Sequence, residues 1–167
     1  MFRTVADFQK SWEYEAECTL KLFRALTDGS LQQAVTPHDR TLGRIAWHIV
    51  TSVPEMMQRT GLRLSGPDEK APMPAQAAAI AAAYDTVAKS LAEQLRERWT
   101  DETLHEKDDM YGQPWKRGFT LATLVRHQAH HRGQMTVLMR QAHLRVPGVY
   151  GPAREEWGEF GMQPPAV

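Results

Sequence analysis

The apolar residues of this chain recur with the helical period of about 3.6 residues in four separate stretches, and this pattern constrains the fold most strongly. The four stripes lie within residues 5–26, 42–56, 80–95 and 119–142. No stretch alternates apolar and polar residues as a half-buried strand would, and no internal repeat is visible. The sequence therefore predicts an all-α fold, a four-helix bundle with long connections, in a single domain spanning residues 1–167.

Local signals place the ends of these helices. Thr41 is a good N-cap for the second helix, and Pro54 should bend that helix or interrupt its hydrogen bonds. The stretch SGPDEKAPMP (65–74) and the polar stretch 100–117 contain Pro and Gly, which indicates long irregular connections. After the fourth helix, the tail should contain turns and one helical turn around 155–157.

Composition excludes several classes of protein. Lys+Arg and Asp+Glu are 20 each, so no net charge attracts nucleic acid or an anionic membrane surface. No apolar run reaches the length of about 20 residues that a membrane-spanning helix needs. The charged N-terminal stretch does not resemble a signal peptide, and the lone Cys18 cannot form an internal disulfide. These features predict a cytoplasmic protein.

The stretch LVRHQAHHRGQM (124–135) places histidines where the helical period calls for apolar residues. His127 and His131 fall on the inward face one turn apart, and His130 lies at the edge of that face. A histidine pair at this spacing is a common way to bind zinc and related metals. The alternative is a hydrogen-bonded pair in the core, because burying two polar rings without partners costs about 2–6 kcal/mol.

A stable site needs a third ligand from another element, and His48 on the flank of the second stripe is the candidate. The remaining histidines lie in predicted loops or after the last helix: His38, His105 and His143. Two known motifs are absent. Gln128 stands where a zinc metalloprotease has its glutamate base, and none of the four predicted helices holds the Glu-x-x-His motif of di-iron bundles.

Three segments resemble the DinB/YfiT-like superfamily of metal-binding four-helix bundles: LGRIAWHIVTSVPEM, LVRHQAHHRGQM and RVPGVYGP. The resemblance implies that His48, His127 and His131 are the metal ligands and that His130 is a neighbour. It also implies a divalent transition metal, with zinc or nickel as the first expectation, and three imidazoles are compatible with iron or cobalt as well. Relatives include bacillithiol transferases and mycothiol-dependent isomerases, so a low-molecular-weight thiol is an expected partner. DNA binding is not implied.

Three imidazoles would leave a coordination position open, as in catalytic rather than structural sites. The expected function is therefore metal-dependent thiol S-transfer or hydrolysis on a small molecule, with no catalytic residue assigned. Glu55 is a candidate base, Tyr84 and the aromatics of 111–115 could line a pocket, and Lys116 and Arg117 could bind carboxylates. Each also has an ordinary structural explanation. The alternatives are a non-catalytic metal-containing module for small-molecule binding or stress response, and a purely structural bundle.

Ala129 and Gly133 are small residues one turn apart on the back of the fourth helix. Glycine inside a helix costs about 1 kcal/mol relative to alanine, so close approach of another helix would offset that cost. The approaching helix could belong to the same chain or to a second copy. Since homodimers are common in the superfamily, a homodimer is expected.

Overall fold

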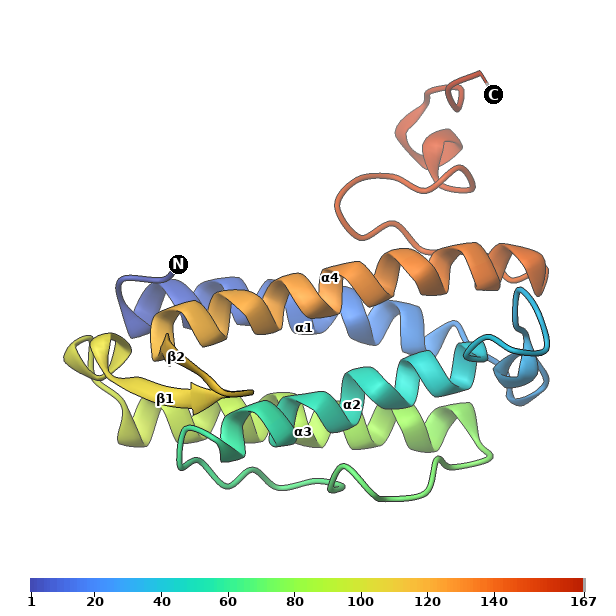
Figure 1. Ribbon diagram of the computed structural model, residues 1–167. Helices are drawn as coiled ribbons and strands as arrows, with labels where there is room; N and C mark the ends of the chain where they lie inside the picture. The colour runs from blue at the N-terminus through green and yellow to red at the C-terminus, as the bar shows by residue number, and fades with distance from the viewer. Residues whose placement is uncertain (167) are drawn as a thin grey trace.

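Four α-helices dominate the computed structural model, which describes residues 1–166 (Figure 1). They are α1 (Val5–Arg24), α2 (Leu42–Gln58), α3 (Ala77–Arg98) and α4 (Arg117–Gln141). Three short 3₁₀ turns are η1 (Asp28–Gln32), η2 (Glu102–His105) and η3 (Trp157–Phe160). Each predicted apolar stripe lies on one of the helices, so the predicted all-α bundle is confirmed.

The helices form a closed ring in which each contacts two others. α1 packs against α3 and α4, and α2 packs against the same two helices. α1 and α4 run in one direction while α2 and α3 run in the other, as the chain colours show (Figure 1). Because α2 and α3 are parallel, the linker 59–76 must return along the whole bundle, and Figure 1 shows it doing so. This topology places α2 directly beside α4.

Caps and a continuous core fix these helices. The Thr41 hydroxyl accepts a hydrogen bond from the backbone N–H of Arg44 at 3.2 Å, as the sequence predicts for an N-cap. The α2 helix continues through Pro54 to Gln58 and is not ended there. The largest fully buried apolar side chains come from α1, η1, α2 and α3: Phe8, Trp12, Leu22, Phe23, Leu31, Leu42, Ile49, Met57, Ile80, Tyr84 and Leu91.

A short hairpin replaces the irregular connection expected before α4. Strands β1 (Lys107–Met110) and β2 (Gln113–Lys116) pair antiparallel, with Met110 opposite Gln113. The two turn residues Tyr111 and Gly112 have φ of 61° and 81°, as a type I′ turn requires. The sequence pattern does not reveal this small hairpin, because turn geometry defines it and neither strand contains the β-branched residues typical of strands.

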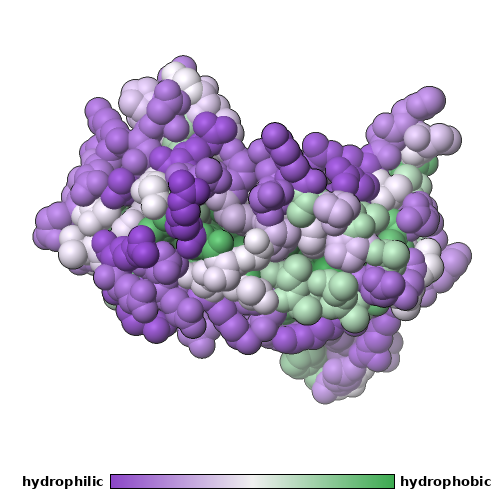
Figure 2. Space-filling model, turned by 90° about the horizontal axis from the view of Figure 1, so that it is seen from below, coloured by the Kyte–Doolittle hydropathy of each residue, from purple (hydrophilic) through white to green (hydrophobic). Residues whose placement is uncertain are grey.

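The ends of the molecule lie outside the ring. The first part of the tail after α4 contacts the outside of the bundle, where Tyr150 reaches Glu15 of α1. Its helical turn, Trp157–Phe160, overlaps the predicted stretch 155–157 at Trp157 (Figure 1). Seen from the linker side, apolar atoms gather where the linker leads into α3, and α3 exposes Ala78 and Ala82 in its first turns (Figure 2). No helix among residues 1–166 has the length and apolar character needed to cross a membrane.

The start of α4 is packed too closely for a side chain at Gly118. A Cβ atom there would lie 2.7 Å from the Phe2 carbonyl oxygen and 3.4 Å from that of Leu104. We predict that Gly118→Ala lowers the free energy of unfolding by about 1–3 kcal/mol, because the backbone must move to admit the methyl group. Gly29→Ala is the control, since a Cβ at Gly29 meets nothing within 4 Å. Urea denaturation measures both, and equal stabilities would contradict the packing described.

Candidate metal centre

Neighbouring helices bring three histidines to one point. His48 comes from α2, and His127 and His131 come from successive turns of α4. The Nε2 atom of His127 lies 3.1 Å from that of His48 and 3.1 Å from that of His131. One ring nitrogen from each residue can be chosen so that all three atoms lie within 4.8 Å of one another. The structure thus brings together the three residues singled out from the sequence.

The spacing of these nitrogens suits a shared ion. Two imidazole nitrogens bound to one tetrahedral zinc, each at about 2.0–2.1 Å, lie about 3.3 Å apart. The two 3.1 Å separations are close to this value. The described residues that form this potential site include no carboxylate and no thiol. Three histidine nitrogens are therefore a donor set that could bind a transition metal ion, with room for a further ligand.

The surroundings keep the three rings uncharged. Burial, together with the charges of the neighbouring imidazoles, lowers the pKa of His48 and of His127 to about 4. Burial also lowers the pKa of His131. The cation of Arg40 acts in the same direction on all three rings, and that of Arg44 acts on His48. At neutral pH the imidazoles therefore hold the lone pairs that a metal needs.

Gln134 orients one ring of the cluster. Its side-chain oxygen lies 2.7 Å from His131 Nδ1, so that nitrogen donates a proton and Nε2 keeps its lone pair toward the other histidines. The amide nitrogen of Gln134 lies 3.2 Å from Nε2 of the exposed His130, which is outside the cluster. His127 Nδ1 is buried without a partner among the described residues, so packing orients this ring.

The adjacent face of α4 carries a second polar pair, Gln128 and Arg132, each of which follows a cluster histidine by one residue. Gln128 is fully buried, and its side-chain oxygen accepts hydrogen bonds from Tyr84 at 2.6 Å and from Thr19 at 3.1 Å. Tyr84 is therefore a core tyrosine whose hydroxyl has a hydrogen-bond partner. This is the structural role that the sequence left open beside a place in the pocket. The contacts of Gln128 connect α4 to both α1 and α3.

Arg132 completes this second pair and is 1% exposed. Its guanidinium is paired with the buried Glu15 carboxylate and donates to Thr19 Oγ1 at 2.8 Å and to the Glu15 carbonyl at 3.0 Å. The tail also reaches this network, because the Tyr150 hydroxyl donates to Glu15 at 2.8 Å. A buried ion pair and its hydrogen bonds thus fix α1, α4 and the tail together.

Other residues considered from sequence have different roles. The Glu55 carboxylate binds Arg59 at 2.8 Å and the hairpin residue Tyr111 at 2.7 Å, so it anchors the hairpin to α2 rather than serving the histidines. Arg117 is paired with Asp108 at 2.9 Å and also with Glu106, while Lys116 is exposed. The loop and end histidines lie apart from the cluster and are exposed: His38, His105 and His143.

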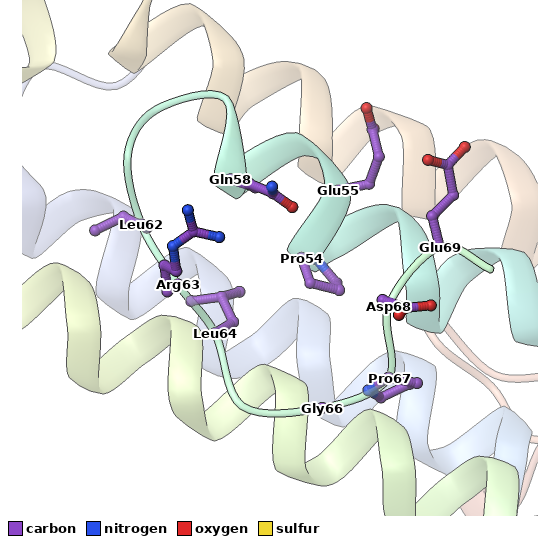
Figure 3. Close-up of a pocket in the computed structure, with 10 residues that line it drawn as sticks. All are labelled: Pro54, Glu55, Gln58, Leu62, Arg63, Leu64, Gly66, Pro67, Asp68 and Glu69. Atoms are coloured by element: carbon purple, nitrogen blue, oxygen red, sulfur yellow. The ribbon is translucent and has the colours of Figure 1, made fainter. Parts of the chain in front are cut away.

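Two pockets differ in their relation to the cluster. One, of about 600 Å³, is lined by His131 itself together with Arg40, Gln134 and apolar residues. The other, of about 150 Å³, lies between the end of α2 and the linker and contains no histidine (Figure 3). Of these two pockets, only the first is lined by a histidine of the cluster, His131.

The sequence alone does not reveal the contacts of Arg40, Arg132 and Gln134 around the cluster. Gln134 follows His131 by three residues, a spacing that places two side chains on one side of a helix and could have identified it. Arg132 lies next to the histidine face, but its partner Glu15 is 117 residues away and gives no local signal. The position of Arg40 depends on the path of the loop before α2, which the sequence pattern does not define.

The ring of four helices and the three-histidine cluster define a helical bundle with a potential mononuclear metal centre. The chain belongs to the DinB family, whose model matches residues 1–164. It is 48% identical over 167 residues, the full length of both chains, to the uncharacterized protein YrdA of Bacillus subtilis (strain 168).

Two crystal structures have the same fold. A DinB-like protein from Bacillus cereus ATCC 10987 has 48% identity and a TM-score of 0.86, over 90% of this chain and 100% of that one. A DinB-like protein of Bacillus subtilis, YjoA, has 15% identity and a TM-score of 0.68, over 88% of this chain and 99% of that one. At 15% identity, the likeness to YjoA concerns the fold alone.

The low pKa values predict acid sensitivity of the metal-free protein. Between about pH 4 and pH 6.5, His48 and His127 stay neutral when folded but are protonated when unfolded. The unfolded chain then binds more protons, so stability present above pH 6.5 is lost as the pH falls toward 4. The melting temperature of chelator-treated protein should fall as the pH is lowered from about 6.5 to about 4. The variant His127→Ala should show a smaller change of melting temperature with pH. An unchanged slope in this variant would contradict the pKa assignment.

The Gln134 contact predicts an effect on metal affinity without loss of a ligand. Gln134→Leu should weaken zinc binding about 10- to 100-fold, the usual effect of removing a group that orients a histidine ligand. Gln134→Glu should restore much of the affinity because a carboxylate can accept the His131 proton. His130→Ala is the control, and competition with a chromophoric chelator measures each constant. Equal affinities for Gln134→Leu and the wild type would disprove the orienting role.

Proposed function

We propose that His48, His127 and His131 bind one divalent transition metal ion and that the protein uses it as an enzyme acting on a small molecule. The observation that carries this proposal is the approach of three Nε2 atoms, with two separations of 3.1 Å, between α2 and α4. Three protein ligands leave a coordination position for a substrate. Zinc or nickel suits the neutral imidazoles best, and iron or cobalt is compatible with the same donors.

We propose thiol S-transfer as the reaction class. A divalent metal in this position would lower the pKa of a bound thiol and so supply a thiolate nucleophile at neutral pH. The sulfur would form a bond to an electrophilic carbon, whose leaving group departs with the bonding electrons, and the thiol proton would pass to solvent. This chemistry requires no carboxylate base, which agrees with the use of Glu55 by Arg59 and Tyr111. The thiol-dependent relatives implied by the sequence resemblance support the same class.

Hydrolysis is the second candidate, supported by the open coordination position, at which the metal could activate a water molecule. It would gain from a base close to the cluster, and the described residues that form the potential site supply none. The non-catalytic alternative is a metal-containing module that binds a small molecule or takes part in a stress response. A conjugation assay with a panel of thiols and electrophiles separates these possibilities. Metal-dependent thioether formation supports the transferase, and metal binding without turnover supports the module.

The ligand assignment predicts which histidines retain the metal. Alanine at His48, His127 or His131 should remove nearly all bound metal, whereas His130→Ala and His143→Ala should retain it. The measurement is metal content by mass spectrometry after purification without a histidine tag, with circular dichroism as a control for folding. The assignment is wrong if His48→Ala keeps full metal occupancy while His130→Ala loses it.

We also propose a homodimer that buries the back of α4. Gly133 is exposed, and a Cβ there would meet no described atom of the same chain within 4 Å. Close approach within the chain therefore does not explain this glycine, and a second copy is the explanation that we propose. Sedimentation at micromolar concentration should show a dimer, and Gly133→Lys should dissociate it without unfolding the monomer. A single wild-type species near 19.0 kDa, the mass of one chain, would exclude the dimer.

A further inference from the structure

The part of α4 that carries the histidines has almost no apolar side chain to hold it in place. Residues 126–134 include no apolar residue larger than Ala129. The helix on either side of them buries large apolar side chains: Leu121, Leu124, Met135, Leu138 and Met139. Apolar packing is non-directional, whereas a hydrogen-bonded ion pair fixes an orientation. The orientation of residues 126–134 therefore depends on polar contacts, chiefly those of Gln128 and Arg132 with α1 and α3.

Tyr150 of the tail contacts both partners of the ion pair in this part of α4. Its hydroxyl donates at 2.8 Å to Glu15 Oε2, the carboxylate oxygen that the Arg132 guanidinium also contacts. The guanidinium donates to the same hydroxyl and lies over the Tyr150 ring, 5.4 Å from its centroid. Burial and the hydrogen bond to Glu15 raise the pKa of Tyr150 to about 12, so the hydroxyl keeps the proton that it donates. A tail residue thus restricts the position of a buried side chain of α4.

Metal binding is more sensitive to the orientation of α4 than apolar packing is. A side-chain atom at the surface of a helix lies about 5–6 Å from the helix axis, so a rotation of about 2° moves it by about 0.2 Å. A displacement of about 0.2 Å is the whole tolerance of a metal–ligand distance, whereas apolar contacts lose much of their energy only over about 0.5–1 Å. Arg132 directly follows His131, so a rotation at Arg132 moves His131 as well.

We propose that Tyr150 is a positioning residue of the three-histidine centre. By holding the Glu15–Arg132 ion pair in place, it sets the orientation of α4 and with it the position of His131 relative to His48 on α2. The proposal rests on the proposed metal site and identifies a tail residue that controls the affinity of that site. Tyr150 is not a ligand and acts only through the ion pair.

The chain contains a matched control for Tyr150. Tyr14 of α1 also holds the tail, because its hydroxyl donates to the Val149 carbonyl at 2.6 Å. The two tyrosines are similarly exposed, Tyr14 by 53% and Tyr150 by 58%, so phenylalanine at either position should keep the wild-type fold. Tyr14→Phe loosens the tail next to Tyr150 without taking a hydrogen-bond partner from Glu15 or Arg132.

The test compares metal binding by the full-length wild type, Tyr150→Phe and Tyr14→Phe. Competition with a chromophoric chelator gives the zinc Kd, and the visible absorption of cobalt-loaded protein reports the coordination geometry. Tyr150→Phe should weaken zinc binding about 10-fold, at the lower end of the effect of groups that orient metal ligands, because it acts through Arg132. It should also alter the cobalt bands. Tyr14→Phe should leave the zinc Kd and the cobalt bands unchanged.

The outcomes separate the inference from the function on which it rests. An unchanged zinc Kd or unchanged cobalt bands in Tyr150→Phe would overturn the inference, and so would equal effects in Tyr150→Phe and Tyr14→Phe. A lower melting temperature of metal-free Tyr150→Phe with the wild-type zinc Kd would mean that Tyr150 only stabilises the fold. In each of these cases the metal centre stands. Failure of the wild type to bind zinc would overturn the proposed function and the inference with it.

Discussion

The candidate site depends on how α4 is oriented about its own axis, because this orientation decides which face of the helix points toward α2. This helix carries two polar pairs with i, i+4 spacing, offset by one residue: His127 with His131, and Gln128 with Arg132. Gln128 and Arg132 bind groups on α1 and α3, of which the Glu15 carboxylate is the most important. Breaking a buried ion pair of this kind costs about 3–5 kcal/mol, because the remaining charge stays buried without a partner. The ion pair therefore holds the adjacent histidine face toward α2.

This arrangement keeps the three imidazoles in the neutral form, which is the form that can bind a cation. The three rings are partly desolvated and close together, so protonating them is unfavourable and their pKa values are low. Gln134 sets the proton of His131 on the nitrogen facing away from the cluster. The lone pairs of the three nitrogens repel one another at this spacing, and a bound metal ion would replace that repulsion by favourable metal–nitrogen bonds. A pocket of about 600 Å³ lies beside the cluster and is lined by one of the three rings, His131.

Local sequence signals were sufficient for the helices and for the histidine pair. The period of the apolar residues defines the buried face of each helix, and the Thr41 cap marks the start of α2. The i, i+4 spacing places His127 and His131 side by side on one helix, independently of the tertiary structure. His48 required one further step, because its approach to α4 depends on the order of helices around the ring. The family resemblance supplied that step, and the structure brings the three rings together.

Contacts between distant residues could not be predicted in this way. Nothing near Arg132 indicates that its partner is Glu15, and nothing near Glu55 indicates that it binds the hairpin residue Tyr111. The hairpin itself depends on two consecutive residues with positive φ, which Tyr-Gly signals less clearly than Asn-Gly does.

X-ray absorption at the metal edge, on protein purified with its native metal and without a histidine tag, tests the central claim most directly. We expect one metal per chain, with three imidazole nitrogens at about 2.0–2.1 Å and a further light-atom or thiol ligand at the open position. A first shell without imidazole scattering, or a metal–metal vector from a two-ion site, would contradict the three-histidine centre formed by α2 and α4.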